Sequence, residues 1–250
     1  MIPKIIHYCW FGHDEYPEKV AYCIETWKKY LSDYELRLWN EDNFDVSCCD
    51  FAKQAYEEKK YAFVSDYVRL VALKNYGGIY LDTDVEVVKA FDDILHHDMV
   101  LGTDDCGVLI TSFMAAEAGH PFFSEMEELY RCIKFKMTDG RLNMKVNTQW
   151  LQERLERYGF KEKNEHQELE HGIVVYSDEY FHAKSLVSGE LRKTNNTYCI
   201  HHHTLLWVPF YTKIIKFLRI RILVPILGAE KYQQKVKRIK ELWKGRGHDK

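Results

Sequence analysis

Two aspartates separated by one residue, Asp82 and Asp84, follow the apolar run Gly-Gly-Ile-Tyr-Leu at 77–81. On a regular strand their side chains share one face. If the strand ends there, both carboxylates point into the crevice at the carboxyl edge of an α/β sheet, where such folds bind ligands. Converging carboxylates repel each other unless a cation lies between them, and hard oxygen ligands favour Mg²⁺ or Mn²⁺ with a diphosphate. The alternative is a strand end with solvated acids, because so short a pattern often arises by chance.

A second charged pair precedes this segment. Asp66 and Arg69 are three residues apart in a helical pattern, so they share a helix face. The pair Gly77-Gly78 ends that helix with a tight turn, which makes a cleft-facing pair plausible. The alternative is a surface ion pair that contributes less than about 1 kcal/mol.

The elements that must position these residues alternate between apolar strands and amphipathic helices. This alternation predicts a single α/β domain with a mostly parallel central sheet. The expected strands are 2–11, 34–39, 79–88, 99–101, 108–110, 173–176 and 198–202, and the expected helices are 18–31, 51–75, 121–135 and 146–158.

The block from 61 to 88 resembles a known family. Its pattern S-D-x-x-R-x-x-x-L-x-x-x-G-G-I-Y-x-D-x-D is similar to the hallmark of glycosyltransferase family 32, whose members have a DXD sugar-binding region. The opening segment IPKIIHYCWFG and the segment YCIHHHTLLW at 198–207 resemble the two ends of that family's domain. Gly119-His120-Pro121 and Glu179-Tyr180-Phe181 also match, so the resemblance covers roughly residues 2–209.

This resemblance implies a GT-A-like (Rossmann-like) fold, a nucleotide-sugar donor, with a UDP-sugar favoured, and Mn²⁺ or Mg²⁺. It implies retaining transfer of a hexose to a glycan or lipid-linked acceptor, in surface or capsular polysaccharide synthesis. By position, Trp10 stacks on the base, Asp66 and Arg69 bind the donor sugar, Asp82 contacts ribose or sugar beside the metal, and Asp84 binds the metal. Tyr80 and Trp207 are assigned to the donor site on the same ground.

The histidines at 201–203 offer a further metal ligand. Neutral imidazole binds Mn²⁺ reasonably well. Successive side chains alternate along a strand, so His201 and His203 point opposite to His202. We assign His202 as the ligand, with His201 as the second choice, and a polar histidine cluster as the alternative. The family has a serine where this chain has Leu206, so a hydroxyl near the diphosphate is missing.

Composition sets the remaining expectations. The chain has 250 residues, and residues 211–250 hold 12 Lys and Arg against 3 Asp and Glu, interleaved with large apolar residues. We therefore expect a domain over 1–210 and a basic, amphipathic helical appendage over 211–250, which either contacts an anionic membrane or packs on the domain. Residues 1–210 carry a net negative charge, which would repel phosphates and argues against nucleic acid as a binding partner. Seven cysteines without regular spacing and no signal-peptide pattern predict a cytoplasmic protein. The basic tail adds the alternative of a peripheral position on the inner face of the plasma membrane.

Two alternatives remain open. Asp82 and Asp84 loosely fit the nucleophile strand of a haloacid-dehalogenase-like phosphatase, with Asp104-Asp105 as a later acid pair, although their separation is short for that fold. The chain could also be a degenerate transferase that binds a nucleotide sugar or glycan without turnover, which Leu206 motivates.

Overall fold

The computed structural model describes residues 1–204, 214–215, 217–229, 231–232 and 234–235. Its centre is a seven-stranded sheet in the order β2-β1-β3-β6-β5-β8-β7, beside a two-stranded sheet of β4 and β9. Five strands of the large sheet run in one direction, and β6 and β7 run the other way. The strands are β1 (Ile5–Cys9), β2 (Glu35–Trp39), β3 (Gly78–Leu81), β4 (Val85–Val87), β5 (Met99–Gly102), β6 (Phe113–Ala116), β7 (Gln167–Glu168), β8 (Ile173–Tyr176) and β9 (Cys199–His201).

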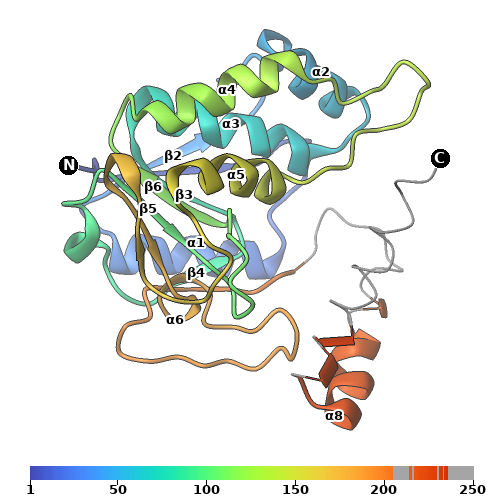
Figure 1. The fold of residues 1–250 in the computed structure, drawn as a ribbon. Coiled ribbons are helices and arrows are strands. Elements are labelled where there is room, and N and C mark those ends of the chain that lie inside the picture. Colours follow the sequence, from blue (N-terminus) through green and yellow to red (C-terminus); the bar gives the residue numbers. More distant parts are fainter. Residues whose placement is uncertain (205–213, 216, 230, 233, 236–250) are drawn as a thin grey trace.

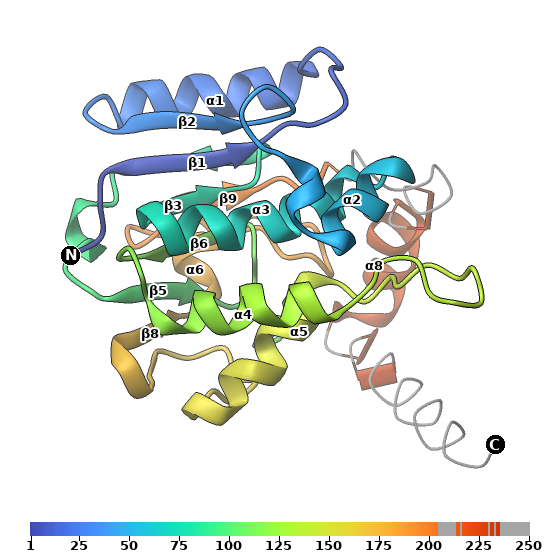
Figure 2. The same cartoon turned by 90° about the horizontal axis from the view of Figure 1, so that it is seen from above.

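Helices cover both faces of the large sheet. Figure 1 shows α2, α3, α4 and α5 above it and α1 and α6 below it, and Figure 2 looks down on the upper layer. The helices are α1 (Glu18–Tyr30), α2 (Asp50–Glu57), α3 (Tyr61–Tyr76), α4 (Pro121–Cys132), α5 (Asn147–Leu155) and α6 (Asp178–Phe181). The α/β architecture expected from the sequence is confirmed.

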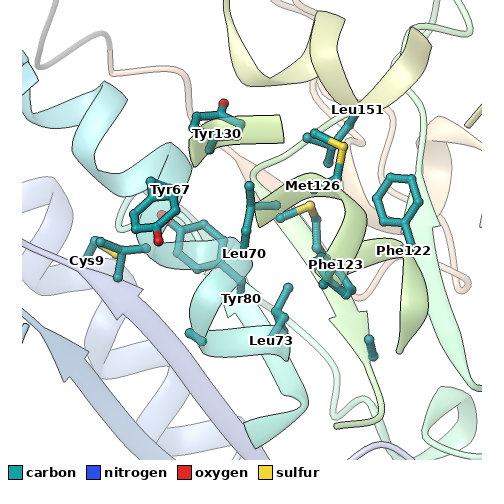
Figure 3. Close-up of a cluster of buried hydrophobic side chains, with 14 of the residues drawn as sticks. Cys9, Tyr67, Leu70, Leu73, Tyr80, Phe122, Phe123, Met126, Tyr130 and Leu151 are labelled. Carbon is teal, nitrogen blue, oxygen red and sulfur yellow. The ribbon is translucent and has the colours of Figure 1, made fainter. Parts of the chain in front are cut away.

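The core consists of two layers because side chains alternate along each strand. On β3, Tyr80 faces the layer of α2 to α5, whereas Ile79 and Leu81 face the layer of α1. Figure 3 shows the upper layer, where Tyr67 and Leu70 of α3 pack in one cluster with Tyr80 of β3 and aromatic side chains of α4. The sheet is thus buried on both faces, which fixes the register of β3 and the position of the residues that follow it.

Some expected elements are divided or displaced. The expected helix 51–75 consists of α2 and α3, because the chain turns at Lys59, whose φ is 53°. The expected strand 79–88 breaks after Leu81 into β3 and β4, which belong to different sheets. The segment 108–110 forms only an isolated bridge from Leu109 to Thr103, and β6 follows it instead.

The turn at Gly77 and Gly78 has the predicted role. Gly77 ends α3 with a φ of 63° and donates its N–H to the carbonyl of Leu73. A Cβ on Gly78 would lie 2.6 Å from the carbonyl oxygen of Ile5 on β1. Only glycine therefore lets β3 begin directly after α3 and pair in parallel with β1.

A buried histidine beside this turn makes stability depend on pH. His7 of β1 accepts a hydrogen bond from Trp39 Nε1 at Nδ1 (3.1 Å) and donates from Nε2 to the carbonyl of Gly77 (2.8 Å). Burial lowers its pKa to about 4, although the bond to Gly77 opposes this shift. The folded state therefore binds fewer protons than the unfolded state, and stability falls as the pH drops from about 6.5 toward 4.

We expect this group to account for a loss on the order of 3 kcal/mol across that range. His7→Gln should flatten the pH dependence, because glutamine can still donate to Gly77 but does not titrate. Urea unfolding between pH 7 and 4.5 measures the slope. His13→Gln is the matched control, since the His13 side chain is 70% exposed. A wild-type slope in His7→Gln would contradict the prediction.

The C-terminal segment lies beside the loop that follows α6. Within it, a short π-helical stretch, η5 (Arg219–Leu223), leads into α8 (Val224–Leu227). Arg219 donates to the carbonyl of Leu186 at 2.7 Å. Leu206 and Trp207 lie outside the described residues, as does much of the expected appendage. No helix among the described residues is long and apolar enough to cross a membrane.

Candidate active site

A turn at residues 82–84 carries the chain from the large sheet to the small one. Asp82 donates its N–H to the carbonyl of Ser112, and its own carbonyl accepts the N–H of Val85. The sequence predicted that the two aspartates lie on one regular strand. This prediction is wrong, because the chain turns between them. They flank the turn, at the carboxyl end of β3, and their carboxylates converge there.

Asp84 is held as a buried, ionised carboxylate. Its side chain is 11% exposed, and its Oδ2 accepts hydrogen bonds from the N–H (2.8 Å) and the hydroxyl (2.9 Å) of Thr204. His201 Nε2 lies 3.1 Å from Oδ1. Burial raises the pKa of this carboxyl, but His201 and Thr204 outweigh burial and hold the pKa well below its ordinary range. The negative charge is thus present at all physiological pH values.

A histidine from the small sheet completes a group that suits a metal ion. β4 pairs with β9 so that Val85 lies opposite His201. One ligand atom each from Asp82, Asp84 and His201 lies within 4.8 Å of the others. Two carboxylates and an imidazole are a suitable donor set for Mn²⁺ or Mg²⁺.

His202 does not lie with this group. Its Nε2 is 2.7 Å from Oε2 of Glu86, and Glu86 also accepts a hydrogen bond from Tyr22. The rings of His201 and His203 lie 4.0 Å apart, centre to centre, and His202 lies apart from them against Glu86, as the sequence predicted. The side that faces Asp84 is that of His201, so the structure brings His201, and not the predicted His202, to the two aspartates.

Arg69 links the helix pair to the acidic turn. Its guanidinium lies 3.0 Å from Asp66 Oδ1 and 3.5 Å from Asp82 Oδ1, and its side chain is only 5% exposed. It also donates to the carbonyl of Thr111 at 2.6 Å and to that of Ser65 at 3.2 Å. Burial raises the pKa of Asp66 to about 6, against the lowering effect of Arg69. The interpretation of Asp66 and Arg69 as a solvated surface pair is therefore wrong.

The two aromatic candidates have different surroundings. Tyr80 is 2% exposed, and the Arg69 guanidinium lies 4.4 Å from the centre of its ring. Tyr80 therefore supports Arg69 from the core. Trp10 follows β1, which runs parallel to β3, so it lies at the same edge of the sheet as Asp82. Its Nε1 donates to the carbonyl of Asp14, and its ring meets Tyr16 edge to face.

Sequence reasoning missed four polar residues of this region. Thr204 binds Asp84, and His182 lies against His201 and His203. Asn147, at the start of α5, donates from Nδ2 to the carbonyl of Asp66. Among the described residues, Asn147 Oδ1 and Ser112 Oγ are buried without a hydrogen-bond partner. The histidine-threonine run at 201–204 could have pointed to Thr204, but no local signal marks Ser112, His182 or Asn147.

The comparisons with known proteins agree with this geometry. Residues 17–101 match the family model described as a glycosyltransferase sugar-binding region containing a DXD motif. Inositol phosphoceramide mannosyltransferase 3 of Schizosaccharomyces pombe is 31% identical over 129 residues, which are 50% of this chain and 36% of that protein. The uncharacterized glycosyltransferase L373 of Acanthamoeba polyphaga mimivirus is 31% identical over 105 residues, 38% of this chain and 40% of that protein. The chain thus spans less than half the length of these curated relatives.

A solved structure supports the fold. A glycosyltransferase involved in the glycosylation of the major capsid of PBCV-1 superposes with a TM-score of 0.50, covering 81% of this chain and 95% of its own. At 11% sequence identity, this similarity concerns the fold alone.

Proposed function

We propose that this chain, whose residues 17–101 match a glycosyltransferase sugar-binding region with a DXD motif, is a family 32-like glycosyltransferase that transfers a hexose from a nucleoside-diphosphate sugar to a glycan or lipid-linked acceptor. The donor we favour is a UDP-sugar, and the process is the synthesis of a surface or capsular polysaccharide. The observation that carries the proposal is the convergence of Asp82, Asp84 and His201 beside the Asp66–Arg69 pair at one edge of the sheet.

The donor set fits a divalent cation. Asp84 is kept ionised although it is buried, and a fixed negative charge of this kind is costly unless a cation balances it. Asp82, Asp84 and His201 would hold Mn²⁺ or Mg²⁺. When bound, the ion supplies charge neutralisation for the leaving nucleoside diphosphate.

The residues of the chain orient the donor. Arg69 is fixed by two carboxylates and two backbone carbonyls, so its remaining donor capacity points in a set direction. Asp66 and Arg69 hydrogen-bond hydroxyls of the donor sugar, and Trp10 at the same sheet edge stacks on the base. Charged hydrogen-bonding groups discriminate between sugar epimers better than an apolar pocket does.

We propose that transfer retains the anomeric configuration without a covalent intermediate. The carboxylates described around the acidic turn are already engaged: Asp66 and Asp82 by Arg69, and Asp84 by Thr204 and His201. The acceptor hydroxyl then attacks from the face on which the diphosphate leaves, and catalysis rests on positioning and electrostatics. A glycosyl adduct detected on the protein by mass spectrometry would contradict this pathway.

The test of the function is a panel of UDP-, GDP- and dTDP-sugars, each with Mn²⁺, Mg²⁺ or EDTA. GDP-mannose is included because one relative is named a mannosyltransferase. We expect one donor class to stabilise the protein, by about 2.7 kcal/mol at 100 times its Kd, and to be hydrolysed only when metal is present. Stabilisation without hydrolysis would favour the non-catalytic binder. No response from the folded protein to any donor would overturn the proposal.

We further propose that the C-terminal segment holds the enzyme on the inner face of the plasma membrane. The described part exposes large apolar side chains, with Ile215 60%, Phe217 61% and Ile226 74% exposed, beside Arg219 and Arg221. Apolar residues that insert and cations that meet anionic headgroups are typical of an interfacial helix.

Deleting residues 213–250 should therefore abolish binding to phosphatidylserine vesicles at moderate salt. Each Lys or Arg near the surface contributes about 1 kcal/mol, so the loss should be large. Vesicle sedimentation measures it, and pure phosphatidylcholine vesicles serve as the uncharged control. Equal binding by the intact and truncated chains would mean that the segment is only structural.

A further inference from the structure

A cluster of three histidines lies directly beside the acidic turn. One ligand nitrogen each from His182, His201 and His203 lies within 4.8 Å of the others. The ring centres are 4.0 Å apart for His201 and His203, 4.7 Å for His182 and His203, and 5.9 Å for His182 and His201. His201 ends β9, His203 follows it, and His182 comes directly after α6.

The backbone brings these rings together at a conformational cost. His203 has a φ of 52°, in the left-handed region that residues other than glycine seldom adopt. His203 is 9% exposed and His182 is 3% exposed, so both rings are removed from solvent. Nδ1 of His182 has no hydrogen-bond partner among the described residues, and a buried polar atom left in this state destabilises the fold. A ligand bound at Nδ1 of His182 would satisfy this buried atom.

We propose that His182, His201 and His203 form a second metal site that selects a late transition metal such as Zn²⁺. Three imidazoles suit Zn²⁺, whereas the carboxylates of Asp82 and Asp84 suit the harder Mg²⁺ and Mn²⁺. Zinc–nitrogen bonds of about 2.0–2.1 Å place ligand nitrogens about 3.3 Å apart, so the three nitrogens, which lie within 4.8 Å of one another, would draw closer on binding. Three protein ligands leave the fourth tetrahedral position to another ligand.

The two sites share His201. Its Nε2 lies 3.1 Å from Asp84 Oδ1, and its ring also borders His203. A zinc ion in the histidine site draws His201 away from Asp84 and places a second dication beside the first. Binding of Zn²⁺ therefore weakens binding of Mn²⁺, and by linkage the reverse also holds. This coupling rests on the proposed Mn²⁺ site, whereas zinc binding itself does not.

Zinc affinity, measured without any donor, tests the site. The metal-free full chain, with any purification tag removed, is titrated with Zn²⁺ against a chromophoric chelator and with Co²⁺ by visible absorption. We expect one strong site in the wild type. His182→Gln and His203→Gln should each weaken zinc binding by at least roughly 10- to 100-fold. Replacing a residue that only hydrogen-bonds a metal ligand already causes a loss of that size, and these two changes remove ligands. Circular dichroism establishes that each variant is folded.

Two further variants show whether zinc binds in the histidine cluster or in the acidic site. Asp82→Asn should leave zinc affinity unchanged, because Asp82 is outside the histidine cluster, and it should weaken Mn²⁺ binding. His166→Gln, at a histidine whose side chain is 53% exposed, should behave like the wild type. Loss of zinc binding in Asp82→Asn with none in His182→Gln and His203→Gln would place zinc in the acidic site and overturn the proposal. Failure of the wild type to bind zinc would overturn it equally, and neither result bears on donor hydrolysis.

Discussion

Replacing Asp84 with asparagine is expected to lower metal-dependent donor hydrolysis by about 100- to 1,000-fold, the loss typical when one fixed electrostatic contact is removed from an active site. The amide keeps the shape of the carboxylate and can still accept a hydrogen bond from Thr204, so the fold should survive. The amide lacks the negative charge that Asp84 carries in this buried site, where the pKa of the carboxyl is held well below its ordinary range. Initial rates across Mn²⁺ concentrations measure the effect.

Two adjacent histidines supply the matched control for this experiment. His201 lies against Asp84 and His202 against Glu86, although they are neighbours in the chain. His201→Gln should weaken Mn²⁺ binding, and His202→Gln should leave it unchanged. The opposite pattern would restore the original assignment of His202. Wild-type hydrolysis in Asp84→Asn would remove Asp84 from the mechanism.

Replacing Arg69 with methionine is expected to destabilise the protein by about 3–5 kcal/mol at pH 7, the cost of removing one partner of a buried ion pair. Asp66 and Asp82 would then face each other without the cation that lies 3.0 and 3.5 Å from them. The methionine also cannot donate to the carbonyls of Thr111 and Ser65. Urea unfolding measures the free energy.

The pH dependence of this loss distinguishes a charge effect from a packing effect. The pKa of Asp66 is already raised to about 6, and removing Arg69 raises it further. A protonated Asp66 needs no cation, so the loss should shrink as the pH falls from 7 to 5. Lys28→Met is the control, because Lys28 and Glu25 form an exposed pair that contributes less than about 1 kcal/mol. A loss that does not change with pH would indicate packing alone.

Local patterns predicted much of this fold. The amphipathic pattern over 18–31 predicted α1, and Gly77 and Gly78 correctly marked the end of α3. The predicted family resemblance and the GT-A-like α/β fold are confirmed. The breaks at Lys59 and after Leu81 were missed. The charged run 57–60 also fits a solvated helix face, and the polar residues 82–84 also fit the alternation of a continuing strand.

The sequence by itself indicated which residues could do the chemistry: the block from 61 to 88 places Asp66 and Arg69 on one helix, and Asp82 and Asp84 directly after the next strand begins. Only the tertiary structure decided how they meet. Alternation along the expected strand 198–202 separates His201 from His202 but cannot say which of them faces Asp84. That choice depends on the pairing of β4 with β9, more than 100 residues apart in the chain. Such a register is set by burial of side chains on both sheets at once, which no local window of sequence contains.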